Sequence, residues 1–245
     1  MKIILGKKIA MAQRFGADGQ VVPVTIVEAG PCFITQVKTA ATDGYQAIQI
    51  GYGQKKKINK PLSGHLKNLK ARHIKELRLD KEEKAAYQVG EKIDVSIFKK
   101  GEIVKVRGTT KGHGFQGVVK RHGFHGAPKT HGTKDQLRHS GSVGAKGVAH
   151  TFKGTKMGGR MGGEQMTINN LEVIEIEPEN NLLYIKGAIP GSRNSLVEIY
   201  APGEMKLEAI TTEKIPEPAE EVAPQVAAEV EEIEAKTENK EEVKV

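Results

Sequence analysis

The feature that most restricts how this chain can fold is a long stretch, residues 108–163, that follows neither the helical nor the strand period. It contains fifteen Gly, six of the eight His, ten Lys or Arg and a single acid, Asp135. Glycine adopts backbone angles that other residues resist, and these side chains offer little apolar area to offset the entropy of ordering. A segment of this length without regular structure is improbable inside a compact domain unless it has a function. We therefore expect a loop that extends from a body built by the flanking segments.

The flanking segments carry strand signals on both sides of this loop. Short apolar runs such as VVPVTIVE and CFITQVKT are separated by turn residues such as GADGQ and TDG. The pattern predicts a mainly β fold. Residues 54–88 change character, being basic at first and partly helical towards their end. The sequence divides into a β body (1–53, 91–107 and 164–203), a basic insertion (54–90), the extended loop (108–163) and an acidic tail (204–245).

Charge is distributed very unevenly along the chain. The tail has thirteen Glu and five Lys, a net charge of −8. Since the whole chain has a net charge of +8, residues 1–203 carry +16. A tail rich in Glu, Ala, Pro and Val without aromatics is predicted to be disordered. The basic body points to a polyanion, and nucleic acid is the first candidate. The single Cys32 excludes an internal disulfide and suggests a reducing compartment, and residues 1–15 are too briefly apolar for a signal peptide or membrane span. We expect a cytoplasmic protein.

A nucleotide-binding loop is the first alternative for the glycine-rich segment. Gly112, Gly114 and Gly117 form G-x-G-x-x-G after an expected strand, and Val119 extends the pattern to its kinase form. A dinucleotide fold needs a helix to open here, but VVKRHGFHG contains two further glycines. A kinase needs H-R-D and D-F-G motifs, and neither string occurs in the chain. We reject a nucleotide loop.

A metal site is the second alternative. His122 and His125 have a chelating spacing, but a structural zinc site needs four ligands, usually with thiolates, and Cys32 lies far upstream. A catalytic site needs positioned carboxylates, and Asp135 is alone in the loop. We expect no metal and no cofactor.

The third alternative is a flexible basic ribbon that binds RNA, and it accounts for all the features of residues 108–163 together. The cations neutralise phosphates, the glycines let backbone N–H groups approach the sugar-phosphate chain, and Phe115, Phe124 and Phe152 can stack on unpaired bases. A solvated insert without a partner is the simpler alternative, but solubility does not require charge of one sign. Residues 54–78 add a second basic surface that includes Lys75 and Arg78.

Five strings carry a resemblance to a known family. They are NKPLSGHLK (59–67), VRGTTKGHGFQGVVKRHGF (106–124), THGTKDQLRHSGSVG (130–144), FKGTKMGGRMGGEQMT (152–167) and NLLYIKGAIPG (181–191). Over about residues 1–202 the chain resembles the bacterial form of large-subunit ribosomal protein three.

The resemblance implies a six-stranded β-barrel of the translation-protein type with an α+β insertion. It also implies a long loop that runs through ribosomal RNA towards the peptidyl transferase centre, and binding early in assembly near the 3′ end of the large ribosomal RNA. The implied neighbours are large-subunit proteins fourteen and nineteen. For this chain the resemblance implies no enzymatic activity, no small-molecule substrate and no membrane. A free RNA-binding or RNA-chaperone protein outside the ribosome is the alternative function.

Charge pattern and resemblance together predict the RNA-binding residues. The resemblance places the loop stem at 111–126, the loop tip at 153–164 and the basic insertion segment at 55–78. The predicted RNA-binding residues of the insertion are Lys55, Lys56, Lys57, Lys60, His65, Lys67, Lys70 and Arg72. Those of the loop are Lys111, His113, Phe115, Lys120, Arg121, His122, Phe124, His125, Lys129, His131, Lys134, Arg138, His139, Lys146, Lys153, Lys156, Met157, Gly159, Arg160 and Met161.

Overall fold

A computed structural model describes residues 2–16, 18–66, 69–79 and 87–203 of the chain. The fold is mainly β, which confirms the fold class predicted from the strand pattern. The acidic tail that was predicted to be disordered, 204–245, lies outside the described residues, as does Lys67.

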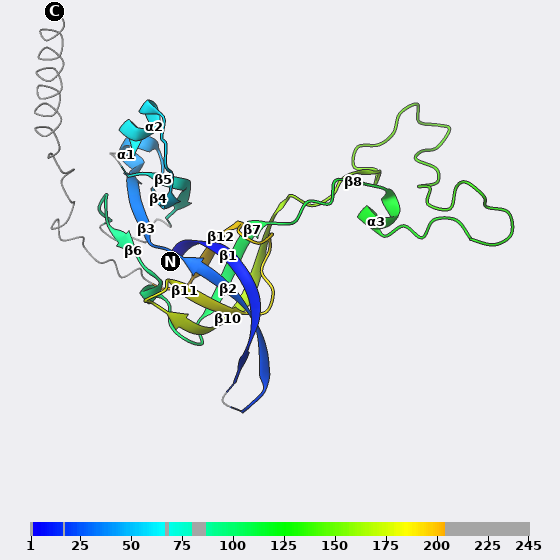
Figure 1. The fold of residues 1–245 in the computed structure, drawn as a ribbon. Coiled ribbons are helices and arrows are strands. Elements are labelled where there is room, and N and C mark those ends of the chain that lie inside the picture. The colour runs from blue at the N-terminus through cyan, green and yellow to red at the C-terminus, as the bar shows by residue number, and fades with distance from the viewer. Residues whose placement is uncertain (1, 17, 67–68, 80–86, 204–245) are drawn as a thin grey trace, which may run out of the picture. The chain divides into compact units, whose positions relative to one another are not determined.

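Six antiparallel strands pair in the order β1-β12-β7-β10-β11-β2 and close into a barrel (Figure 1). Closure pairs the first and last strands of the ring, β1 and β2, so that the barrel has no open edge. The strands are β1 (Lys2–Phe15), β2 (Val21–Ala29), β7 (Ile103–Thr109), β10 (Gln165–Glu177), β11 (Leu182–Lys186) and β12 (Leu196–Ala201).

Alternation of side chains builds the barrel core. In β7, Val104 and Val106 are fully buried while Lys105 between them is exposed, as the strand period requires. At one point β1 and β2 approach too closely for any side chain. A Cβ on Gly6 would lie 2.8 Å from Val27 Cγ1 and 2.9 Å from the Glu28 carbonyl oxygen. Glycine at this position therefore permits the pairing that closes the barrel.

A second, four-stranded sheet has the order β5-β4-β3-β6. Its strands correct the division expected from sequence, because Cys32–Lys38, Ala47–Gln54 and Lys92–Ile93 lie in this sheet and not in the barrel. Strands of both sheets have the same period, and only long-range pairing distinguishes them. Ile34 and Ile50 of this sheet join the same hydrophobic cluster as Ile4 of the barrel. The elements of this region are β3 (Cys32–Lys38), α1 (Ala40–Asp43), β4 (Ala47–Gln54), α2 (Lys60–His65), β5 (Ala71–Arg78), β6 (Lys92–Ile93) and the 3-10 turn η1 (Val95–Ile97).

The partly helical character expected towards the end of 54–88 is not found at Ala71–Arg78. Ala71–Arg78 is the strand β5, which pairs along β4 and buries Ala71 and Leu77. Gly51 allows this contact, since a Cβ there would lie 2.8 Å from Ala71 Cβ. Tertiary pairing thus overrides a weak local helical preference. Residues 80–86, which the same prediction covered, lie outside the described part.

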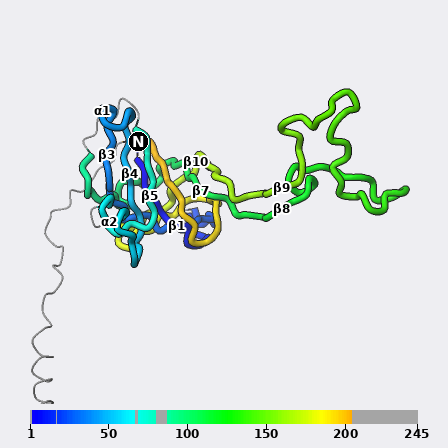
Figure 2. Tube along the Cα trace, turned by 90° about the horizontal axis from the view of Figure 1, so that it is seen from above, coloured from blue at the N-terminus to red at the C-terminus, as the bar shows by residue number. Residues whose placement is uncertain are grey.

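The glycine-rich loop leaves the barrel after β7 and returns at β10 (Figures 1 and 2). Three short elements occur in it: β8 (Phe115–Gln116), α3 (Val118–His122) and β9 (Gly159–Arg160). Throughout the described ranges, no helix is both long and apolar enough to cross a bilayer.

Candidate nucleic-acid interface

The stem of the loop is a two-stranded ribbon held by its own backbone. The Thr110 amide donates to the Glu164 carbonyl at 2.9 Å, and the His113 amide donates to the Met161 carbonyl at 2.8 Å. The Met161 amide returns a bond to the Gly114 carbonyl at 2.9 Å. The pairing then continues into β8 and β9, which lie side by side in Figure 2. The structure therefore adds local order to a stem for which the sequence showed no period.

Glycine is needed where the two stem segments touch. Gly162 has a φ of +72°, and a Cβ there would overlap the Lys111 carbonyl oxygen. A left-handed Gly123 ends α3 after one short turn of helix. The helix that follows the G-x-G-x-x-G motif is therefore only five residues long, too short to present a helix N-terminus to a nucleotide as the dinucleotide-binding fold does.

The short helix α3 fastens the returning segment to the stem. The Arg121 guanidinium donates to the Met157 carbonyl at 2.9 Å, and His122 Nε2 lies 3.0 Å from the same oxygen. The stem thereby surrounds a concavity of about 490 Å³. Six predicted residues from both sides of the loop line this concavity, namely Lys111, His113, Arg121, His122, Arg160 and Met161. Thr110, Gly162 and Glu164 also line it and were missed, because their residue types carry no signal for RNA.

Beyond the stem, most of the predicted residues are exposed, but only some of them lie around a shared cavity. Phe124, His125, His139 and Lys156 line a second concavity of about 860 Å³. The Ala127 amide bonds the Leu137 carbonyl at 3.1 Å across this region. Within 110–163 the only buried side chain is Val118. The remaining predicted cations and histidine of the loop are exposed without a shared cavity, namely Lys120, Lys129, His131, Lys134, Arg138, Lys146 and Lys153.

Several cations of the body have carboxylate partners, whereas the cations of the loop have none among the described residues. On the barrel, Lys2 pairs with Glu102 at 2.9 Å, Arg14 with Glu175 at 3.2 Å, and Lys186 with Glu172 at 3.1 Å. Among the described residues, no ion pair involves any of the ten Lys or Arg of 108–163. The loop therefore presents uncompensated positive charge. Partial burial, and then the charge of Lys111, lower the pKa of Lys8 at the barrel end of the stem.

The basic insertion segment shows the same contrast within a few residues. The cations Lys55, Lys56, Lys57, Lys60, Lys70 and Arg72 are exposed and, in the part of the chain that the structure describes, have no ion pair. Lys75 instead pairs with Glu198 of the barrel at 3.2 Å, and Arg78 lies over the Tyr45 ring at 5.0 Å. These two belong to the fold, so the open basic surface ends at Arg72.

Aromatic rings of the loop are available for stacking. Phe115 is 79% exposed and Phe152 is 60% exposed. The His122 and Phe124 rings lie 6.2 Å apart, and those of His150 and Phe152 lie 5.9 Å apart. An exposed ring of this kind can accept an unpaired base by stacking.

The potential metal ligands of the chain, including Cys32, are not grouped into a site where the structure describes them. No group of three or more potential ligands is found within the described ranges. Cys32 lies in the core, where burial raises the pKa of its thiol to about 12. The cysteine is therefore a core side chain and not an accessible thiolate.

Fold and surface together define a class: a mainly β protein with a barrel body and a long extension whose exposed cations match a polyanion. Comparisons then identify the family. Residues 70–181 match the family model described as "Ribosomal protein L3".

Named relatives agree with the family model. The chain is 52% identical over 203 residues to large ribosomal subunit protein uL3 of Carboxydothermus hydrogenoformans, covering 81% of this chain and 96% of the relative. It is 47% identical to the protein of that name from Desulfitobacterium hafniense, covering 80% and 93% of the two chains. For Corynebacterium aurimucosum the identity is 48%, with 81% and 93% covered. The chain belongs to the ribosomal protein L3 family, whose members are structural and not enzymatic.

Proposed function

We propose that this chain is a structural constituent of the large ribosomal subunit that binds large-subunit ribosomal RNA through the loop and the basic insertion segment. The observation that carries the proposal is the partition of charge. Several barrel cations, such as Lys2, Arg14 and Lys186, are paired with carboxylates, whereas none of the ten loop cations has an ion pair in the described residues. The relatives' name supports the same assignment. As part of the ribosome the protein works in the cytoplasm.

Binding follows from the chemistry of the loop. Phosphate contacts by Lys and Arg supply most of the affinity, and the glycine-rich backbone approaches the sugar-phosphate chain closely. Unpaired bases stack on exposed rings such as Phe115. The predicted residues of the loop and of 55–72 are the proposed contact set. No residue in this set is assigned a chemical step.

The finer assignments rest on the family. In this proposal the barrel is of the translation-protein type and acts as the scaffold for the insertion and the loop. The chain binds early in assembly near the 3′ end of the RNA, and residues 153–164 point towards the peptidyl transferase centre. Large-subunit proteins fourteen and nineteen are the proposed neighbours.

The experiment compares the full chain with a loop deletion in growing cells. Thr110 and Glu164 are bonded backbone to backbone at 2.9 Å, so a two-residue Asn-Gly turn can replace 111–163 and close the ribbon there. The tagged full chain should sediment with large subunits in stoichiometric amount. The deletion should keep a folded barrel but lose most of its incorporation.

Recovery of the full chain with RNA that is not in ribosomal subunits would support a free chaperone instead. Undiminished incorporation of the deletion variant would show that the loop is not the main contact.

A further inference from the structure

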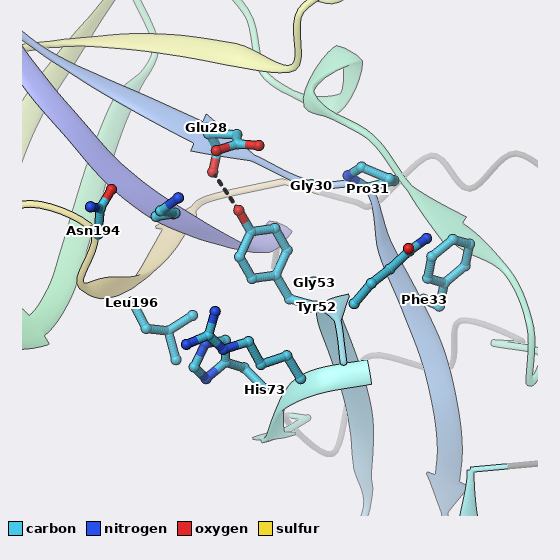
Figure 3. Close-up of a pocket in the computed structure, with 12 residues that line it drawn as sticks. Glu28, Gly30, Pro31, Phe33, Tyr52, Gly53, His73, Asn194 and Leu196 are labelled. Carbon is cyan, nitrogen blue, oxygen red and sulfur yellow. Dashed lines mark hydrogen bonds between the residues drawn. The ribbon is translucent and has the colours of Figure 1, made fainter. Parts of the chain in front are cut away.

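A cavity at the junction of the barrel and the second sheet is not accounted for by the loop. It has a volume of about 620 Å³, within the range of small-ligand sites. Its lining combines strands of both sheets with the 187–195 connection (Figure 3). The residues that matter to its chemistry are Lys7, Glu28, Phe33, Tyr52, Arg72 and His73.

Two cations and one carboxylate set the electrostatics of this cavity. Lys7 of β1 and Glu28 of β2 are register partners, yet no ion pair joins them. Arg72 of β5 is exposed and likewise has no ion pair among the described residues. The cavity thus carries a net positive charge together with one acceptor-only group. This combination suits a ligand with an anionic part and hydrogen-bond donors.

Aromatic rings line the middle of the cavity. The Tyr52 hydroxyl donates to the Glu28 carbonyl at 3.1 Å, which fixes its ring (Figure 3). His73 stacks on Tyr52 with the ring centroids 6.5 Å apart, and both His73 and Phe33 remain partly exposed. Burial, and then the nearby Arg72 and Lys75, lower the pKa of His73, which favours the neutral form of its ring. A neutral, partly exposed ring is suited to stacking on a base.

The cavity is continuous with the basic insertion segment. Gly53 and Gln54 line it and lead directly into Lys55, whose amide bonds the Lys70 carbonyl at 2.9 Å. A nucleic-acid strand that follows these cations therefore passes the cavity mouth. The charge along this path selects a polyanion over a neutral peptide.

We propose that this cavity receives one unpaired nucleotide of the bound RNA. Its base stacks against Phe33 or His73, its donor groups face the Glu28 carboxylate, and its phosphate lies near Arg72 and Lys7. A base with ring N–H and amino donors is favoured, because a carboxylate only accepts hydrogen bonds. The inference rests on the proposed RNA-binding function and adds a nucleotide site outside the loop.

The test uses the full chain and a transcript of the full-length large-subunit ribosomal RNA. Ultraviolet crosslinking with mass spectrometry maps protein–nucleotide adducts, and chemical probing reads the pairing edge of each unpaired base. The variants are Phe33→Ala and Arg72→Ala, with Lys100→Ala as an exposed cation away from the cavity. Thermal unfolding checks that Phe33→Ala is folded, and Arg72→Ala changes an exposed side chain.

The expected result is an adduct between one unpaired nucleotide and a peptide containing Phe33 or His73. That base should be protected by the wild type and deprotected by Phe33→Ala, with affinity falling about tenfold for loss of one stacked base. Lys100→Ala should leave the protection unchanged. Strong RNA binding by the wild type, with no adduct at the cavity and no base deprotected by either variant, would overturn the inference alone. A neighbouring protein crosslinked at the cavity in intact subunits would also overturn it. Failure of the wild type to bind the RNA at all would overturn the proposed function together with it.

Discussion

Neutralising three loop cations should change the salt dependence of RNA binding by an amount that the structure sets. Lys111, Lys120 and Arg160 are exposed, and none has an ion pair or a side-chain hydrogen bond among the described residues. Their replacement by Gln therefore removes charge without breaking a contact of the fold. Each cation that neutralises a phosphate contributes about 0.7 to the slope of log affinity against log salt for single-stranded RNA.

The triple variant should thus have a slope smaller by about 2. Between about 50 and 200 mM salt the ratio of wild-type to variant affinity should fall by about twentyfold. Filter binding or fluorescence anisotropy with large-subunit RNA over this range measures both slopes.

A matched control removes the same charge from the body. Lys99, Lys100 and Lys105 are also exposed without ion pairs in the part of the chain that the structure describes, but they lie outside the proposed contact set. Their triple Gln variant should keep a slope within about 0.5 of the wild type. Equal slope changes in the two triple variants would refute the reasoning, because net charge and not position would then govern binding.

Three further predictions concern the fold that presents the loop. Glu198 accepts a bond from the Tyr200 hydroxyl at 2.6 Å and pairs with Lys75 at 3.2 Å, so Glu198→Gln should lower the unfolding free energy by about 1–3 kcal/mol in urea titrations. Glu179→Gln, at an exposed position, is its control. Equal stability of the two variants would show that the contacts of Glu198 with Tyr200 and Lys75 do not stabilise the fold. Gly6→Ala should cost about 1–3 kcal/mol in thermal unfolding because of the Val27 contact, whereas Gly112→Ala, with open space around it, should be nearly neutral. Burial raises the pKa of Cys32 to about 12, so alkylation at about pH 8.5 should be at least a hundredfold slower in the native than in the urea-unfolded protein. The same raised pKa makes stability fall as pH rises above the unfolded value near 8.5, and rapid native alkylation would show that the thiol is accessible.

Much of the fold could be predicted because strand alternation is a local signal. In the sequence, apolar Val104 and Val106 alternate with the charged Lys105, and in β7 the two valines are buried while Lys105 is exposed. The assignment of Cys32–Lys38 and Ala47–Gln54 to a second sheet could not be predicted, since pairing partners are long-range and the period of a strand does not name its neighbour.

The residue types of the candidate site could be predicted from composition, but the contacts between its residues could not. The loop cations follow from residue counts, yet the bond between His113 and Met161 joins segments that share no pattern. Likewise, the sequence counts Lys75 with the open basic surface, and only the fold brings Glu198 against it. The cavity beside Tyr52 gave no signal, because its residues come from strands spread across the chain.

Lysine footprinting in assembled subunits tests most directly whether the loop is the RNA interface. Brief acylation followed by mass spectrometry compares the free full chain with the same chain in purified large subunits. Lys111, Lys120, Lys153 and Lys156 should react readily in the free protein, where they are exposed, and should be strongly protected in the subunit. Loop lysines that react equally in both states would contradict the account.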